Sequence, residues 1–406
     1  MKILLVHNQY QQLGGETVVF EQEKELLERT GHQVLTYCRS NFEAESYTGL
    51  RKIVLAKNIC WSSETEAQVM RLLRKERPQV VHVHNTFMMI SPSLFAACHT
   101  VGVPVVQTLH NYRLLCPAIN FLREGRVCEE CAEHSLWRGI RYGCYRDSRS
   151  ATATVAMLMY LQRQRRAFPD LFIAVSEFSR DKFIAGGIPA DKIVVKPNFV
   201  YPDPGERSID GDYALFAGRL TEEKGVETLL QAWKQLRTNI PLRIVGDGAL
   251  LDDMKRKAIE LKLTNVTFDG RLSRPAAIQA IKASRFLIVP SECYENCPMG
   301  IIEAFACGVP VIASSLGAMQ TMIDDGRIGL HFAPRDPADL ASKVEWAWSR
   351  RERMREMGKE ARREFDVKYT PENSYPALME IYQRAGAAVT SVAPAEAEVG
   401  LGLSQG

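Results

Sequence analysis

The chain has 406 residues, 46% of them hydrophobic, which is enough for two or three domains with full cores. Its 51 basic and 48 acidic residues nearly balance. Residues 1–200 carry 25 basic against 19 acidic residues, which fits an anionic acceptor, an anionic membrane surface, or an ordinary solvated surface. No apolar run approaches the roughly 20 residues that span a bilayer, and Met1–His7 is too short for a signal peptide. We therefore expect a cytoplasmic protein whose ten cysteines are reduced unless they bind metal.

The N-terminal part predicts a strand, a glycine loop and a helix. Residues 3–7 form the strand, and the following loop contains Gly14 and Gly15, where the missing Cβ lets the backbone approach a ligand. The alternative is that this pair only forms a turn. The loop lacks G-x-G-x-x-G, which disfavours a dinucleotide site. The periodicity of residues 17–29 predicts a helix with a glutamate-rich outer face and an inner face made of Val18, Val19, Leu26 and Leu27.

Two histidines stand at the C-terminal ends of predicted strands. Residues 80–84 end in His84, and residues 103–110 end in His110. Parallel α/β sheets present their ligand sites at such strand ends, although a lone strand-end histidine is also commonly structural. The remaining elements of the first sheet are predicted at 93–99 (helix), 171–176 (strand), 179–186 (helix) and 193–195 (strand).

Residues 112–149 resemble an insertion and contain four cysteines with the spacing C-x11-C-x2-C-x12-C. Four thiolates that include a C-x2-C pair suit tetrahedral zinc, and a cytoplasmic location argues against disulfides. The alternative is four free thiols in a packed loop. The predicted ligands of a structural zinc are Cys116, Cys128, Cys131 and Cys144.

The same segment and the helix predicted at 151–168 combine arginines with aromatic and apolar residues. One interpretation is a groove for an anionic, lipid-linked acceptor at a membrane, with arginines on phosphate. The alternative is a core helix that ends in the solvated run Arg163–Arg166. The arginines concerned are Arg113, Arg123, Arg126, Arg138, Arg141, Arg146 and Arg149.

The second half repeats the strand–helix alternation, which implies a second parallel, doubly wound sheet. A loop with Arg219 and Lys224 follows its first strand, and Gly246 follows the second. The predicted strands are 213–217, 242–245, 266–268, 286–289, 311–313 and 329–333.

The stretch 290–314, PSECYENCPMGIIEAFACGVPVIAS, forms a strand–loop–helix–strand unit. Pro298 sits where a helix takes its first turn, and the free N–H groups of that helix suit phosphate. Glu295 precedes the helix and Glu303 lies within it. Carboxylates accept hydrogen bonds from vicinal hydroxyls, so phosphate and sugar sites together indicate a nucleotide sugar. The alternative is that Glu295 caps the helix and Glu303 is solvated.

This stretch resembles the donor-site signature of the retaining, family-four (group 1 type) glycosyltransferases with the GT-B fold, and the resemblance covers roughly residues 1–385. It implies two doubly wound Rossmann-like α/β domains facing across a cleft. The implied divisions are an N-terminal acceptor-side domain (1–200), a linker (201–212), a donor domain (213–370), a helix returning to the first domain (371–388) and a disordered tail (389–406).

The resemblance also implies roles for individual residues. His110 and Glu295 lie at the donor sugar as catalytic residues, and Glu303 holds the ribose. Asn111 stands where relatives often have aspartate, so it receives no acid–base role; Ala318, Thr321 and Asn296 also depart from the family pattern and leave the donor sugar undefined. The other implied donor-binding residues are Gly14, Gly15, Arg219, Lys224, Gly246, Pro298, Met299, Gly300 and Ile301.

The expected activity is retaining transfer of a sugar from a nucleotide-diphosphate sugar to a glycan or polyprenyl-linked acceptor. It requires no cofactor and no metal at the diphosphate, because Arg219, Lys224 and the helix at Pro298 take that place. We expect no nucleic-acid partner, and a location in the cytoplasm or peripherally on the inner face of the plasma membrane. The alternatives are a nucleotide-sugar epimerase or glycan phosphorylase on the same fold, and a non-catalytic nucleotide-sugar binding protein.

Overall fold

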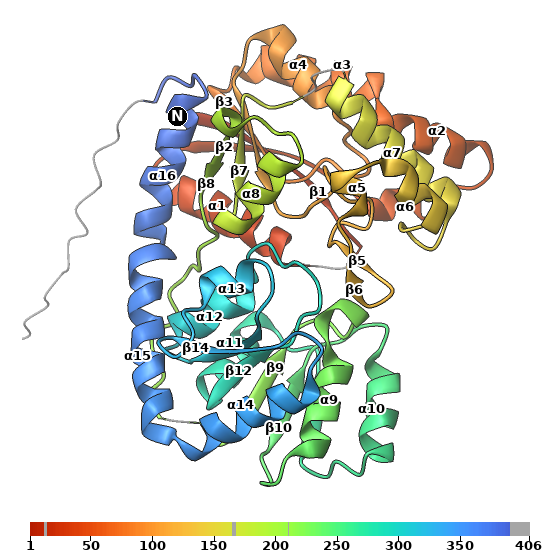
Figure 1. Ribbon diagram of the computed structural model, residues 1–406. Helices are drawn as coiled ribbons and strands as arrows, with labels where there is room; N and C mark the ends of the chain where they lie inside the picture. The colour runs from red at the N-terminus through yellow and green to blue at the C-terminus, as the bar shows by residue number, and fades with distance from the viewer. Residues whose placement is uncertain (12–13, 165–167, 210, 390–406) are drawn as a thin grey trace, which may run out of the picture.

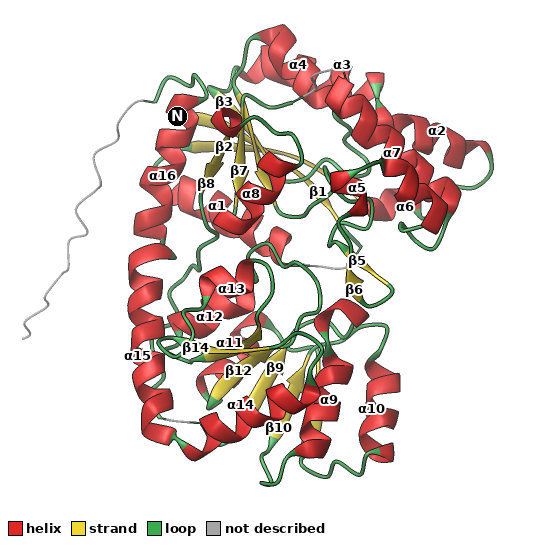
Figure 2. Ribbon diagram, in the orientation of Figure 1, coloured by secondary structure: helices red, strands yellow, loops and turns green. Residues whose placement is uncertain are grey.

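The computed structural model describes residues 1–11, 14–164, 168–209 and 211–389. Two six-stranded sheets lie one above the other, each covered by helices (Figures 1 and 2). In each sheet the first strand is an inner strand, and the strand order runs outward from it in both directions, which is the doubly wound arrangement. The predicted fold class is confirmed.

The first sheet has the order β2-β1-β3-β4-β7-β8 and every neighbouring pair is parallel. Strands β1, β3, β4 and β7 are almost wholly buried, which agrees with their largely apolar sequences, whereas the edge strand β2 is half-buried or exposed. They are β1 (Lys2–Gln9), β2 (Gln33–Ser40), β3 (Val80–Val83), β4 (Val105–Leu109), β7 (Leu171–Ala174) and β8 (Ile193–Val195). The main helices around them are α1 (Gly15–Arg29), α2 (Leu50–Cys60), α3 (Ser63–Glu76), α4 (Ser93–Val101), α7 (Arg149–Gln164) and α8 (Glu177–Ala185).

The second sheet has the order β11-β10-β9-β12-β13-β14, again all parallel. Its strands are β9 (Ala214–Ala217), β10 (Leu242–Val245), β11 (Val266–Gly270), β12 (Phe286–Val289), β13 (Val311–Ser314) and β14 (Gly329–Phe332). Its helices are α9 (Val226–Gln235), α10 (Leu251–Glu260), α11 (Arg274–Lys282), α12 (Met299–Ala306), α13 (Ala318–Met322), α14 (Pro337–Ser349) and α15 (Arg351–Lys368).

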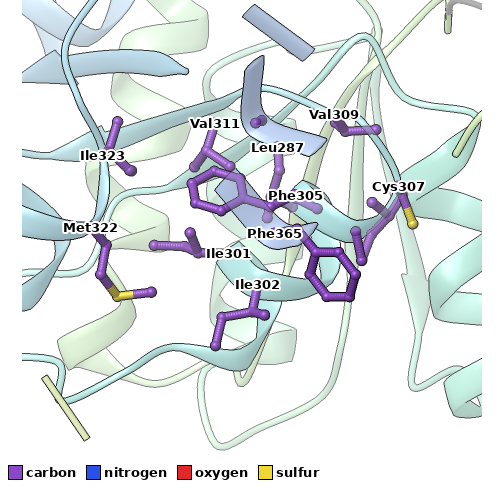
Figure 3. Close-up of a cluster of buried hydrophobic side chains, with 14 of the residues drawn as sticks. Leu287, Ile301, Ile302, Phe305, Cys307, Val309, Val311, Met322, Ile323 and Phe365 are labelled. Atoms are coloured by element: carbon purple, nitrogen blue, oxygen red, sulfur yellow. The ribbon is translucent and has the colours of Figure 1, made fainter. Parts of the chain in front are cut away.

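Helix α12 is fixed by the core beneath it (Figure 3). Ile301, Ile302 and Phe305 are fully buried, and they pack with Val311 of β13 and Phe365 of α15. Burying each such side chain contributes about 1.5–3 kcal/mol. The helix begins after Pro298, which is its N-cap residue in extended conformation. The predicted first turn therefore begins one residue later, at Met299, and the Pro298 carbonyl oxygen accepts from Ile301 N at 3.0 Å.

The last helix, α16 (Pro371–Arg384), leaves the second sheet and runs along the first (Figure 1). Leu378 and Tyr382 of α16 are fully buried in a cluster with Leu5 of β1 and Phe20 of α1. The resemblance implied a helix returning to the first domain over 371–388, and α16 lies within that range. The predicted tail lies outside the described residues from 390 onward.

Helix α1 departs from the prediction on its polar side. Val19, Leu26 and Leu27 are buried as expected, whereas Val18 is only half-buried and Phe20, which was not predicted, is buried. Glu23 is also buried and only 1% exposed. The expected glutamate-rich outer face is therefore incomplete. Glu23 tolerates burial because cationic and polar groups of other elements surround it, as described below.

Candidate donor site

The donor-side residues lie on loops after strands β9 and β12, which are neighbours in the second sheet. Gly225 closes the first loop with φ +66°, and a Cβ there would lie 2.0 Å from the carbonyl oxygen of Pro290. The two loops therefore pack backbone against backbone, which only glycine permits. This contact brings the cations of the first loop to the carboxylates of the second.

Lys224 and Glu295 form the central ion pair of the site, with Nζ and Oε1 2.5 Å apart. The Ser291 hydroxyl donates to the same oxygen at 2.7 Å. Burial by itself raises the pKa of Glu295, but Lys224 outweighs it and holds that pKa below its usual value. Burial likewise opposes the charge on Lys224, and Glu295 raises the pKa of Lys224 despite it. Both groups are therefore charged at neutral pH.

Glu303 points from α12 toward α11 rather than into solvent. Its side chain is 16% exposed, and its Oε1 accepts from Arg274 Nε at 3.3 Å. Burial raises the pKa of Glu303. No side chain caps the N-terminus of α12. The alternative of a capping Glu295 and a solvated Glu303 is therefore wrong.

The first domain presents its glycine loop to α12. Gly14 is the N-cap residue of α1, and a Cβ on Gly15 would lie 3.4 Å from Met299 Cγ. Next to these glycines, Glu16 accepts from Asn85 Nδ2 at 2.9 Å and from Asn111 Nδ2 at 3.5 Å. Although Glu16 keeps partial exposure, burial of its carboxyl group raises its pKa to about 8, against weaker opposition from Arg113.

His110 belongs to a chain of buried polar groups behind the glycine loop. His110 Nε2 lies 3.0 Å from His84 Nδ1, and His84 Nε2 lies 3.2 Å from Glu23 Oε1. Burial lowers the pKa of His84 to about 4 and holds that of His110 well below the usual range. Both imidazoles are therefore neutral. Because a carboxylate only accepts, Glu23 favours the His84 tautomer with its proton on Nε2.

The Glu23 carboxylate also contacts one cationic side chain, Lys196, and one polar side chain, His82. Its Oε2 lies 3.2 Å from Lys196 Nζ, and its Oε1 lies 2.8 Å from His82 Nδ1. Burial raises the pKa of Glu23, but His82 and Lys196 outweigh it and hold it well below the usual value. Glu23, His82 and His84 are the described residues whose possible ligand atoms lie within 4.8 Å of one another. The Lys196 side chain pairs with this carboxylate and offsets its charge.

Contacts between the domains join the two halves of the site. The Tyr294 hydroxyl donates to Glu129 Oε1 at 2.6 Å. The Asn296 amide donates to the carbonyl oxygen of Leu109, which directly precedes His110, at 3.2 Å. Both contacts hold the loop that carries Glu295 against the first domain.

The structure brings some of the predicted site residues into contact and leaves others apart. Lys224 contacts Glu295, and Gly15 lies against Met299, which is followed by Gly300 and Ile301 in α12. Gly246 packs onto Gly218 beside Arg219, because a Cβ there would lie 1.8 Å from the Gly218 carbonyl oxygen. Arg219 instead pairs with Glu223 at 3.4 Å and stays half exposed.

Sequence reasoning missed Glu16, Glu23, Ser291 and Tyr294. Glu16 directly follows the glycine pair, so its position in the first turn of α1 was a usable signal. Glu23 lies among exposed glutamates on one helix, and no local pattern distinguishes it from them.

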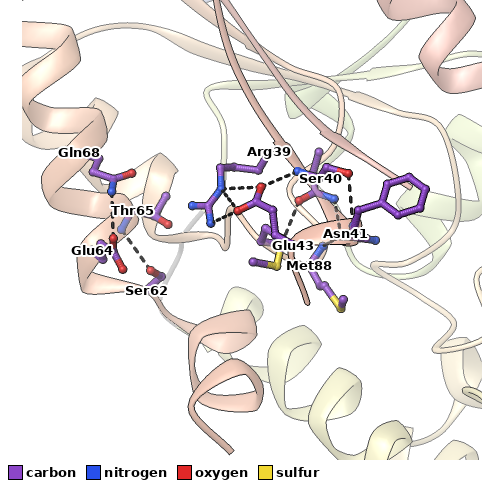
Figure 4. Close-up of polar contacts among 12 residues, drawn as sticks. Arg39, Ser40, Asn41, Glu43, Ser62, Glu64, Thr65, Gln68 and Met88 are labelled. Atoms are coloured by element: carbon purple, nitrogen blue, oxygen red, sulfur yellow. Dashed lines mark hydrogen bonds and ion pairs between the residues drawn. The ribbon is translucent and has the colours of Figure 1, made fainter. Parts of the chain in front are cut away.

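Two cavities in the described part of the chain are lined by none of the donor-side residues above. One of about 490 Å³ opens at the C-terminal end of β2 and is lined by Arg39, Leu50, Ser62, Thr65 and Met88, among others. Figure 4 shows its polar wall, where Glu43 binds Arg39 through both carboxylate oxygens. The other, of about 550 Å³, lies between α13, β14 and α15 and contains no predicted site residue. None of the helices among the described residues combines the length and apolarity that crossing a membrane requires.

Comparison with known proteins gives two consecutive domain matches. Residues 13–203 match the model of Glycosyltransferase Family 4, and residues 204–364 match that of Glycosyl transferases group 1. Glycogen synthase of Mycobacterium tuberculosis is 27% identical over 67% of this chain and 60% of its own. The D-rhamnosyltransferase of Pseudomonas aeruginosa is 29% identical over 39% of this chain and 42% of its own. The chain thus spans about half the length of the curated relatives it matches.

Solved structures share the fold. Sucrose-phosphate synthase of Thermosynechococcus elongatus superimposes with a TM-score of 0.72 at 18% identity, covering 96% of this chain and all of that one. Anabaena HepE in complex with UDP gives a TM-score of 0.67 at 17% identity, covering 94% of this chain and all of that one. Together with the two domain matches, these show that the chain belongs to the group 1 and family 4 glycosyltransferases of the GT-B fold.

Proposed function

We propose that this protein transfers a sugar, with retention of anomeric configuration, from a nucleotide-diphosphate sugar to a hydroxyl of a glycan or lipid-linked acceptor. The observation that carries this proposal is the Lys224–Glu295 pair at the start of α12. It places a fixed cation for phosphate next to a carboxylate that accepts from sugar hydroxyls.

The leaving nucleoside diphosphate gains charge as the bond to the sugar breaks. Lys224, Arg219 and the free N–H groups at Met299 and Gly300 supply positive potential there without a metal ion. The Gly14–Gly15 backbone faces the same place, because Gly15 lies against Met299. Family resemblance supports attack from the leaving-group face, with a donor phosphate oxygen taking the acceptor proton.

A uridine nucleotide is the first donor to test, because HepE has been solved with UDP and with UDP-glucose. Calorimetry with UDP, GDP and ADP, alone and as their sugars, identifies the base. We expect Glu303→Ala to weaken binding of the matching nucleotide, since Glu303 would lose the ribose contact, and Lys224→Ala to abolish transfer. Glu260→Ala on exposed α10 is the matched control. Near-wild-type transfer by both site variants, with folding intact, contradicts the assignment.

The cavity beside β2 is our candidate for the acceptor. Arg39 lines it and is held in place by Glu43, so it presents a fixed guanidinium to an anionic or hydroxylated group. We expect Arg39→Ala to raise the KM for acceptor and to leave nucleotide binding by calorimetry unchanged. A loss of nucleotide binding would place this residue at the donor instead.

We also propose that the enzyme works in the cytoplasm, peripherally on an anionic membrane. Helix α2 exposes Leu50 (80%) and Ile53 (67%), and the exposed Arg51 and Lys52 stand between them. This combination suits insertion at a lipid headgroup layer. The predicted solvated run Arg163–Arg166 is described only in part. Arg163 donates to the Leu114 carbonyl oxygen, and the side chains of the rest of the run lie outside the described residues. Vesicle flotation tests the proposal: Leu50→Asp/Ile53→Asp should lose salt-sensitive binding to anionic vesicles, and equal binding by both proteins refutes it.

A further inference from the structure

The segment between β4 and α7 forms an arm that belongs to neither large sheet. It contains the hairpin β5 (Leu122–Arg123) and β6 (Arg126–Val127), then α5 (Glu130–Glu133) and α6 (Leu136–Tyr142). In Figure 1 the hairpin extends from the first domain toward the second. Its four cysteines, Cys116, Cys128, Cys131 and Cys144, are all free. The donor site uses none of them.

Cys131 and Cys144 contact Gly139 of α6, and Pro117, which follows Cys116, packs against the same glycine. A Cβ on Gly139 would lie 3.0 Å from Cys131 Sγ and 3.1 Å from Cγ of Pro117, the residue after Cys116. Cys144 N donates to the Gly139 carbonyl oxygen at 3.1 Å. The position thus requires a residue without a side chain, because two cysteine segments press on it from outside.

The fourth cysteine, Cys128, is connected by a backbone hydrogen bond to the loop that follows Cys116. Cys128 N donates to the Phe121 carbonyl oxygen at 2.7 Å.

We propose that Cys116, Cys128, Cys131 and Cys144 together bind one Zn²⁺ ion as tetrahedral thiolate ligands. A set of four sulfurs suits zinc and excludes hard cations such as Mg²⁺ and Ca²⁺. No three of these sulfurs lie within 4.8 Å of one another in the described structure. Binding therefore needs rotation of cysteine side chains between staggered positions, and it releases the thiol protons to solvent.

The zinc would brace the arm against the donor domain. Glu129, next to Cys128, accepts from the Tyr294 hydroxyl and from Lys182 Nζ at 2.6 Å each. At the hairpin tip, the Gly125 carbonyl oxygen accepts from Arg335 of the donor domain. Because Tyr294 precedes Glu295, the arm positions the donor loop. This positioning role rests on the proposed function, whereas metal binding does not.

The experiment measures metal in the full chain, purified without chelator, by elemental mass spectrometry. We expect one zinc per chain in the wild type, and close to none in Cys131→Ser and Cys116→Ser. Cys38→Ser, at an exposed cysteine outside the arm, is the matched control and should retain the zinc. Replacement of the zinc by Co²⁺ should give the visible and thiolate charge-transfer absorption of a tetrahedral sulfur site.

Folded wild-type protein without zinc overturns the proposal, and so does zinc that survives in both arm variants. If these variants fail to fold, titration of the native wild type with a mercurial decides, since zinc must be released in step with modification of four thiols. Hydrogen exchange before and after chelation tests whether the zinc holds the arm against the donor domain. After chelation we expect faster amide exchange in residues 112–149 and near Tyr294. Nucleotide calorimetry on the same samples tests the donor site separately, so the two proposals can fail independently.

Discussion

Replacing Glu23 by Gln removes one charge from the buried cluster of the first domain while keeping the shape of the side chain. Glu23 is 1% exposed and Lys196 4% exposed, with Oε2 and Nζ 3.2 Å apart. After the substitution, Lys196 keeps the Ser374 hydroxyl at 3.1 Å and faces a neutral amide in place of the carboxylate. An ammonium is then left buried without its counter-charge.

The expected loss is about 3–5 kcal/mol of unfolding free energy, the usual cost of removing one partner of a buried ion pair. The double variant Glu23→Gln/Lys196→Met removes both charges, and it should recover most of this loss, because the penalty lies in the orphaned ammonium. Glu25→Gln, on the exposed side of the same helix, should change stability by less than about 0.5 kcal/mol.

Urea unfolding followed by circular dichroism, with matched slopes, measures these differences. The pKa of Glu23 lies well below its usual value. Its contribution is therefore complete above the unfolded-state pKa of about 4.3, and it declines as pH falls from there toward the folded pKa. The gap between wild type and Glu23→Gln should narrow below about pH 4.5. A single variant within 1 kcal/mol of wild type, or a double variant no better than the single, would refute the charge-pairing argument.

Three further predictions concern the site and its support. Burial raises the pKa of Glu16 to about 8, so the contribution of Glu16 to stability should decline as pH rises from about 4.5 through about 8. In thermal unfolding scans, Glu16→Gln should remove this decline. A variant with the same pH profile as the wild type contradicts the prediction. Tyr294→Phe, which loses only the hydrogen bond to Glu129, should lower the free energy of unfolding by about 1.5–3 kcal/mol, because the acceptor is charged. If the same substitution causes the same loss in a Glu129→Gln background, the two side chains are not coupled. Phe305→Ala beneath α12 should cost about 3–5 kcal/mol by urea unfolding, and a loss below 1 kcal/mol would mean that the core of Figure 3 does not fix the helix.

Much of the fold follows from local sequence pattern. Short apolar runs alternating with helical periodicity predicted both parallel sheets, and in such sheets the strand ends that bind ligands lie on one edge. Lys224, Glu295 and His110 could therefore be placed at those edges without coordinates. The predicted 213–217 and 286–289 strands differ from β9 and β12 by no more than one residue at either end.

The partners of these residues could not be predicted in the same way. Lys224 and Glu295 are 71 residues apart, and Tyr294 and Glu129 are 165 apart. Helical periodicity assigned the glutamates of α1 to solvent, yet Glu23 is buried because His82, His84 and Lys196 come to it from other elements. Local pattern determined which residues lie at strand ends and where the apolar faces of the helices lie. Only tertiary structure decided which charges are buried, since a counter-charge depends on packing between distant segments.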